Sequence, residues 1–153
     1  MTASDNNIPV SQTIEISHNR FYSVKAITLA TFFGGILAGG YMMAQNFKAV
    51  NDSRKARITW ICVIMLIVFA IVSTIIPAFD KIPAIAYSAF YTIFTGSMAR
   101  KYQSAFIEGH INAGSRYYTT IRVMMVTLIS LILLVSLLLS VFYYLDTFSV
   151  GNH

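Results

Sequence analysis

Four long apolar segments, separated by short polar connections, make up most of the chain after residue 24. A helix rises about 1.5 Å per residue, so roughly 20 apolar residues cross the ~30 Å hydrocarbon core of a bilayer. The segments are about residues 26–45, 58–76, 84–99 and 123–145, and none contains Asp, Glu, Lys, Arg or His. This pattern predicts an all-α polytopic membrane protein, folded as an antiparallel bundle of four transmembrane helices.

The third segment is the least apolar of the four, because Tyr, Ser, Thr and Gly residues dilute it and Arg100 ends it early. A re-entrant or interfacial segment is therefore the alternative at residues 84–99. The positions of the basic residues favour a full span there, because the two most basic loops then lie on the same side of the membrane.

Composition supports the membrane assignment. Hydrophobic residues make up 56% of the 153 residues and charged residues 11%, and the mean hydropathy is +0.65. A water-soluble fold of this length could not bury so much apolar surface. We expect a membrane domain over residues 24–146, preceded by a polar, disordered tail at 1–23 and followed by a short tail at 147–153.

The net charge of +5 comes mainly from two loops beside the apolar segments. Their basic residues are Lys48, Arg54, Lys55 and Arg57 in the first loop, and Arg100, Lys101, Arg116 and Arg122 in the second. Basic residues near membrane segments are retained in the cytoplasm and contact lipid headgroups. The pattern predicts a multi-pass membrane protein with both termini outside, beside Arg20, Lys25 and Lys81. It does not favour nucleic acid as a partner.

Small residues recur at four-residue spacing in the first apolar segment, at Gly34, Gly35, Ala38, Gly39 and Gly40. Such spacing lets helix backbones approach closely inside a membrane. This face either packs the first helix against the rest of the bundle or forms a contact with a partner or a second copy of the chain.

The connection from Arg100 to Arg122 holds the polar residues that we consider functional candidates, Gln103, His110, Gly114 and Arg116. Helical spacing predicts that the third helix continues into the cytoplasm and stops near Gly114. His110 is interpreted as a hydrogen-bonded structural residue, since no second ligand stands at chelating distance along the helix. We expect no metal and no cofactor. At the start of the second helix, Asp52 or Ser53 is the expected N-cap.

Several runs resemble a widespread group of small, uncharacterised bacterial membrane proteins. The matching runs are Phe21-Tyr22-Ser23, residues 33–41, residues 46–50, Tyr102-Gln103, Ile107, His110-Ile111 and Ala113-Gly114. The resemblance implies a four-helix inner-membrane protein and no particular reaction. Ile36 stands where that group has proline, which removes an expected kink in the first helix, and Ala113 replaces the first of two glycines.

No catalytic constellation can be assembled from six acidic residues and three histidines, so an enzyme is not expected. The leading functional hypothesis is a non-catalytic accessory, scaffold or immunity-type subunit that packs against a membrane partner or a membrane-acting toxin. The alternative is an oligomeric small channel or transporter for ions or small solutes, with Tyr87, Tyr91, Thr92 and Thr95 of the third segment along its path.

Overall fold

The computed structural model describes residues 19–76 and 81–150 and is almost entirely helical, which confirms the all-α prediction. The elements are β1 (Arg20–Phe21), α1 (Val24–Ala49), α2 (Ser53–Ile75), α3 (Ala84–Asn112), β2 (Arg116–Tyr117) and α4 (Thr120–Val150). Residues 1–18 of the expected disordered tail lie outside the described residues, as does most of the turn between α2 and α3. The end of that tail is ordered, contrary to the expectation, because Arg20–Phe21 form β1 and Tyr22 is buried. The expected C-terminal tail starts late, because α4 continues to Val150.

Three helical stretches are long and apolar enough to cross a membrane: Val24–Ala49, Ser53–Ser73 and Thr120–Tyr144. The polar residues of α3 keep it out of this set, although its 29 residues are long enough. The chain therefore has the composition of a membrane protein, and the coarse prediction holds. The predicted antiparallel bundle of four transmembrane helices is not confirmed, and α1 does not form one continuous straight helix.

Helix α1 folds back on itself, so that its two ends lie together. The backbone N–H of Tyr22, before the helix, donates to Asn46 Oδ1 at 2.8 Å, and Asn46 Nδ2 donates to the Tyr22 carbonyl at 2.8 Å. Asn19 Nδ2 reaches the Ala49 carbonyl at 2.7 Å. A straight helix would hold Tyr22 and Asn46 about 36 Å apart. The expectation that residues 26–45 form one spanning helix is therefore wrong, and α1 is a helical hairpin.

The hairpin turns at Gly35, where φ is 70° and ψ is −174°. Only glycine adopts this conformation without a large steric penalty. The two half-helices, 24–34 and 36–49, are about 16 and 21 Å long, so each crosses roughly half of a bilayer. Gly39 of the second half lies against Thr31 of the first, and a Cβ at Gly39 would clash with the Thr31 hydroxyl. The loss of proline at position 36 does not keep α1 straight, because Gly35 makes the turn.

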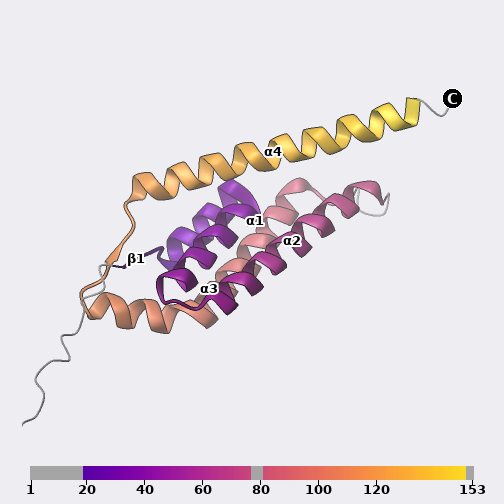
Figure 1. Ribbon diagram of the computed structural model, residues 1–153. Helices are drawn as coiled ribbons and strands as arrows, with labels where there is room; N and C mark the ends of the chain where they lie inside the picture. The colour runs from indigo at the N-terminus through magenta and orange to yellow at the C-terminus, as the bar shows by residue number, and fades with distance from the viewer. Residues whose placement is uncertain (1–18, 77–80, 151–153) are drawn as a thin grey trace, which may run out of the picture.

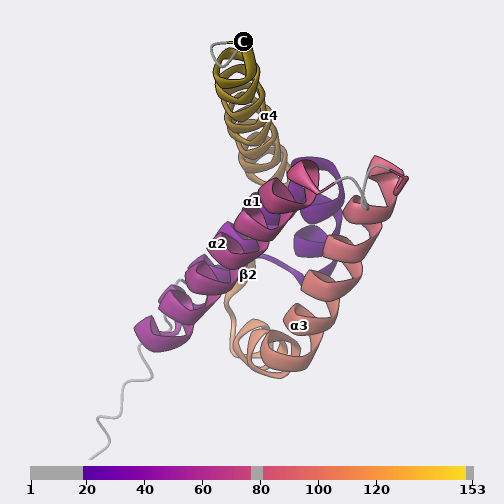
Figure 2. The ribbon, with the colours of Figure 1, turned by 90° about the vertical axis from the view of Figure 1, so that its right-hand side faces the viewer.

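The hairpin occupies the centre of the molecule and contacts the other three helices. Figure 2 shows α1 between α2 and α3, and Figure 1 shows α4 running along a further side of the hairpin. The main apolar core lies around the hairpin and includes Tyr22, Ile27, Ala38, Met42 and Ala99. The packing is therefore organised around α1 rather than around four equivalent helices.

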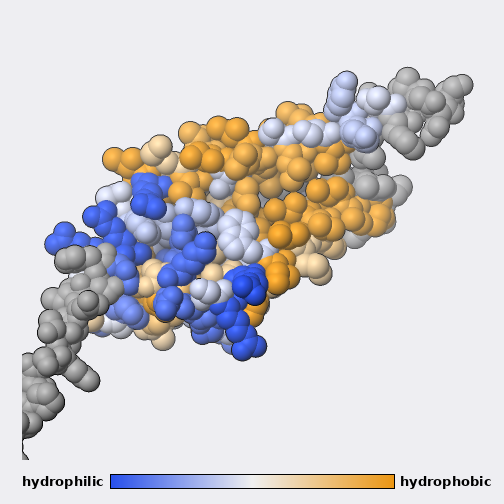
Figure 3. Space-filling model, viewed as in Figure 1, coloured by the Kyte–Doolittle hydropathy of each residue, from blue (hydrophilic) through white to orange (hydrophobic). Residues whose placement is uncertain are grey.

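Strands β1 and β2 form a two-residue parallel pair in which Arg20 lies opposite Arg116 and Phe21 opposite Tyr117. This pairing corrects the expectation that Arg20 and Arg116 lie at opposite ends of the protein. Hydrophilic side chains gather at this end of the molecule, while the remaining visible surface is largely apolar (Figure 3). We call this end the basic end and the end near Lys81 the distal end.

Candidate functional site

The base of the hairpin is closed by a buried polar network of Tyr22, Asn46 and Gln103, which we call the hub. Asn46 Nδ2 donates to Gln103 Oε1 at 3.0 Å, in addition to its two bonds with the Tyr22 backbone. Gln103 Nε2 donates to the Met43 carbonyl at 2.9 Å. All three side chains are fully buried. A buried polar group that loses a hydrogen-bond partner destabilises the fold, so the hub holds both ends of α1 against α3.

A second set of contacts joins the hub to the start of α4. Arg122 Nε donates to the Tyr22 hydroxyl at 3.2 Å, and the guanidinium lies 4.2 Å from the centre of the Tyr118 ring. The rings of Tyr22 and Tyr118 are 4.3 Å apart. Burial raises the pKa of Tyr22 above its ordinary value, although the Arg122 hydrogen bond opposes that shift. Tyr22 therefore stays neutral and ties three helices together.

The candidates predicted in the connection after the third segment have separate roles. Gln103 lies within α3 rather than in a loop and belongs to the hub. His110 Nδ1 lies 2.8 Å from the Phe106 carbonyl one turn back, and its ring packs on Phe21. Gly114, with φ of 100°, follows the end of α3, as expected for a helix stop. Arg116 lies in β2 and is exposed.

Each small residue of the predicted packing face lies within the fold. A Cβ at Gly34 would meet the Thr127 carbonyl of α4 at 2.8 Å, and one at Gly40 would clash with Val63 of α2. Gly39 also approaches Thr95 of α3, and Ala38 is fully buried. These close approaches join α1 to the three other helices of the same chain.

The basic residues of the first loop stay at the surface. Lys48, Arg54, Lys55 and Arg57 are exposed. Asp52 is the N-cap of α2, as expected, with its carboxylate accepting from the Lys55 N–H at 3.0 Å. The same carboxylate pairs with Lys55 Nζ at 2.8 Å.

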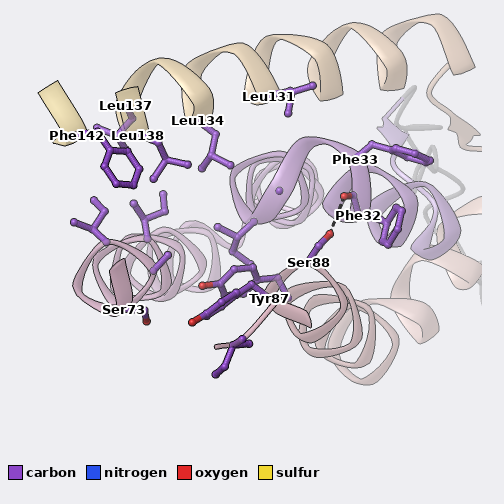
Figure 4. A pocket seen from close by; sticks show the side chains of 17 residues that line it. Phe32, Phe33, Ser73, Tyr87, Ser88, Leu131, Leu134, Leu137, Leu138 and Phe142 are labelled. Carbon is purple, nitrogen blue, oxygen red and sulfur yellow. Dashed lines mark hydrogen bonds between the residues drawn. The ribbon is translucent and has the colours of Figure 1, made fainter. Parts of the chain in front are cut away.

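A cavity of about 610 Å³ lies above the tip of the hairpin, between the distal halves of α2, α3 and α4. Phe32, Phe33, Gly35 and Ile36 form its floor. Leucines of α4 form one wall, with Leu131, Leu134, Leu137 and Leu138 pointing toward it (Figure 4). The hairpin ends part of the way along the other helices, so the space above its tip is left unfilled.

Three hydroxyl-bearing residues of α3 border this apolar cavity: Tyr87, Ser88 and Tyr91. Ser88 Oγ donates to the Phe32 carbonyl at 3.1 Å and so satisfies one acceptor at the end of the first half-helix (Figure 4). Tyr91 is only 8% exposed, and its hydroxyl has no hydrogen-bond partner among the residues described. The Tyr91 hydroxyl oxygen itself has almost no accessible surface, and Thr95 Oγ1 of the same helix is buried without a partner in the same way. Buried hydroxyls are rarely left unpaired, so a polar ligand group would pair with the Tyr91 hydroxyl only if the ring turned toward the cavity.

The polar face predicted along α3 is thus divided between two tasks. Tyr87 and Tyr91 border the cavity. Thr92 instead donates to the Ser88 carbonyl of its own helix at 2.7 Å, and Thr95 is buried against Gly39. Only the distal part of the face is available to a bound molecule.

Two residues central to this arrangement were not singled out from the sequence. Asn46 was noted within a family-like run, and Tyr22 likewise, but neither was assigned a contact. Asn46 is an uncharged polar residue at the end of an apolar segment and lies 24 residues after Tyr22. The sequence does not indicate that the two residues pair unless the chain is known to turn back between them.

Within residues 19–76 and 81–150, no three His, Cys, Asp or Glu side chains are grouped closely enough to hold a metal ion. Comparison with family models, curated proteins and solved structures gives no match for this chain.

Proposed function

We propose that this chain is a non-catalytic membrane protein of the carrier or ligand-binding class, which holds a lipid-type amphiphile in the distal cavity. The observation that carries the proposal is the apolar cavity above a helix break, bordered by Tyr91, whose buried hydroxyl has no partner among the described residues. Irregular backbone at membrane depth is tolerated where it is buried in protein or lines a cavity, and broken helices often mark binding sites.

The lining favours an apolar molecule over an ion. Side chains of α2 and α4 around the cavity are mostly aliphatic or aromatic, and its volume of about 610 Å³ is typical of small-molecule sites. A hydrophilic path would need more polar groups. We therefore keep the transporter-class alternative suggested by the sequence but change its ligand. The bound molecule would have an acyl or isoprenoid-like chain instead of being an ion, and its hydrogen-bonding group would be directed to Tyr91.

The helix-packing hypothesis is a second candidate on a different surface. A foreign helix could reach Gly34, Gly39 or Gly40 only by displacing α4, α3 or α2. Helix α4, in contrast, exposes most of its apolar surface, since 6% of its most apolar window is buried. A partner subunit, toxin or second copy would therefore contact α4, on the face that lipid otherwise covers.

We also propose that the basic end faces the cytoplasm of a bacterial cell. The hairpin brings Arg20 to the end that carries the two basic loops, and the remaining basic residue at the distal end is Lys81. Ten of the eleven Lys and Arg residues then lie on one side, which fits the positive-inside rule better than the topology predicted for a straight first helix. Residue 19 would lie inside and the end of α4 outside.

The binding proposal is tested by native mass spectrometry of the protein purified in mild detergent, then titrated with a long-chain fatty acid. Ala70 lines the cavity on α2, so Ala70→Trp should fill the space and abolish co-purified and added ligand. Ile93→Trp is the matched control, because Ile93 is 69% exposed on the outside of α3.

Tyr91→Phe tests the polar contact separately. It should weaken binding about three- to tenfold, the range expected for one hydrogen bond of roughly 0.5–1.5 kcal/mol. Equal ligand occupancy in the wild type and in folded Ala70→Trp protein would contradict the proposal.

A further inference from the structure

Two arginines from distant parts of the sequence are held side by side at the basic end. Arg20 and Arg116 are register partners in the β1–β2 pair, and both are exposed. Partners in adjacent strands have Cα atoms about 5 Å apart and project to the same face. Like charges placed directly opposite one another destabilise a strand pair, so this arrangement needs a compensating contribution.

The pair is fixed in place from several directions. Phe21, between Arg20 and Tyr22, is fully buried and packs on Phe106 and His110. The Tyr118 N–H donates to the Phe21 carbonyl at 2.9 Å. The two arginine backbones therefore cannot separate to relieve their repulsion without breaking buried contacts.

Within residues 19–76 and 81–150, no acidic side chain forms an ion pair with Arg20 or Arg116. Among the described residues one ion pair is present, between Lys55 and Asp52. Arg54 of the first loop differs in this respect, because its charge helps to lower the pKa of the Asp52 carboxyl group. In the part of the chain that the structure describes, Arg20 and Arg116 thus form a doublet without an acidic partner, beside the exposed ring of Tyr117.

We propose that Arg20 and Arg116 together bind a phosphate group, supplied by the headgroup of an anionic phospholipid in the leaflet at the basic end. Two guanidinium groups on one face offer parallel N–H donors to phosphate oxygens, which suits bidentate recognition. A membrane-adjacent position makes lipid the natural source, with free phosphate as the other source of the same chemistry. This site is independent of the distal cavity, so either proposal can fail without the other.

The test compares two double variants that each remove two charges from a net charge of +5. Arg20→Gln/Arg116→Gln removes the doublet, and Arg54→Gln/Arg57→Gln is the matched control at the same end. Each protein is titrated with phosphatidylglycerol in detergent, and bound lipid is counted by native mass spectrometry. We expect at least a tenfold loss of affinity in the first variant and less than threefold in the control.

Two further readouts keep the result interpretable. Arg20→Gln/Arg116→Gln should melt no lower than the wild type without added lipid, because repulsion is relieved, and should lose the upward shift in Tm that phosphatidylglycerol gives the wild type. Arg20→Lys/Arg116→Lys should recover only part of the affinity. Equal losses in both glutamine variants would overturn the proposal, while binding of inorganic phosphate without binding of the lipid would overturn the lipid source.

Discussion

The basic end and the distal end of this molecule differ in how completely their interiors are packed and hydrogen-bonded. At the basic end, the hub of Tyr22, Asn46 and Gln103 is fully buried, and the side-chain amides of Asn46 and Gln103 find partners across the hairpin and α3. At the distal end, a cavity of about 610 Å³ stays open and the Tyr91 hydroxyl has no partner among the described residues. The comparison indicates that one half secures the fold and the other is available for binding.

The hairpin explains why the two ends differ. Its half-helices fill only the half of the bundle near the basic end, where they supply the core around Ile27 and Met42. Beyond Gly35 three helices surround a space that a straight first helix would have filled. A cavity in the distal half therefore follows from the turn in α1.

The largest effect is expected from breaking the hub. Asn46→Leu leaves the Tyr22 N–H and carbonyl without their partner in a buried site, which should cost roughly 2–4 kcal/mol of stability. The measurement is unfolding in SDS–detergent mixtures. Gln45→Leu is the control, since Gln45 is half-buried and bonds only the Tyr41 hydroxyl among the described contacts. Equal effects at both positions would show that the hub does not stabilise the hairpin.

Next in size is the turn itself. Gly35→Ala forces a side chain into a backbone region reserved for glycine and toward Leu134, at a cost of about 1–3 kcal/mol. Gly109→Ala is the matched control, because Gly109 lies within α3 and a Cβ there meets nothing within 4 Å. That change should stabilise the helix slightly. Tolerance of Gly35→Ala in the same unfolding assay would argue for a straight α1.

A much smaller effect on stability is expected at the distal end. Tyr91→Phe removes a hydroxyl that makes no hydrogen bond in the described structure, so the free energy of unfolding without ligand should change by less than about 0.5 kcal/mol. Ligand affinity should fall, as set out above. A large loss of stability in delipidated protein would show that the hydroxyl serves the fold.

The smallest effect should come from the exposed cap of α2. The hydrogen bond and charge of Lys55 lower the pKa of Asp52 below 3.8. A lowered pKa in the folded protein contributes stability above the ordinary pKa, and this is lost as pH falls through the folded value. Asp52→Ala should therefore be slightly less stable than the wild type at pH 7, and the difference in stability should narrow as the pH falls below 3.8. A constant difference across that range would contradict a contribution from the carboxylate charge.

Periodicity and composition identified the helices and their approximate ends, the Asp52 cap and the stop near Gly114, because these depend on local sequence. The hairpin in α1 could not be predicted from periodicity and composition. Residues 26–45 have the length and hydropathy of a membrane-spanning helix. The sequence raises the alternative of a re-entrant segment at residues 84–99 instead, because that segment is more polar. Whether α1 is straight or a hairpin depends on the backbone conformation of Gly35 and on the hydrogen bonds between Asn46 and Tyr22. A pattern of apolar residues predicts neither of them.

The most direct test of the hairpin is a distance between its two ends. Spin labels at Arg20→Cys and Lys48→Cys, both exposed positions, can be measured by pulsed electron paramagnetic resonance in lipid nanodiscs, with the exposed Cys62 replaced by Ser. The contact of Asn19 with Ala49 predicts a backbone separation of at most about 15 Å. A distribution centred near 40 Å, the length of a continuous helix over these residues, would contradict the account.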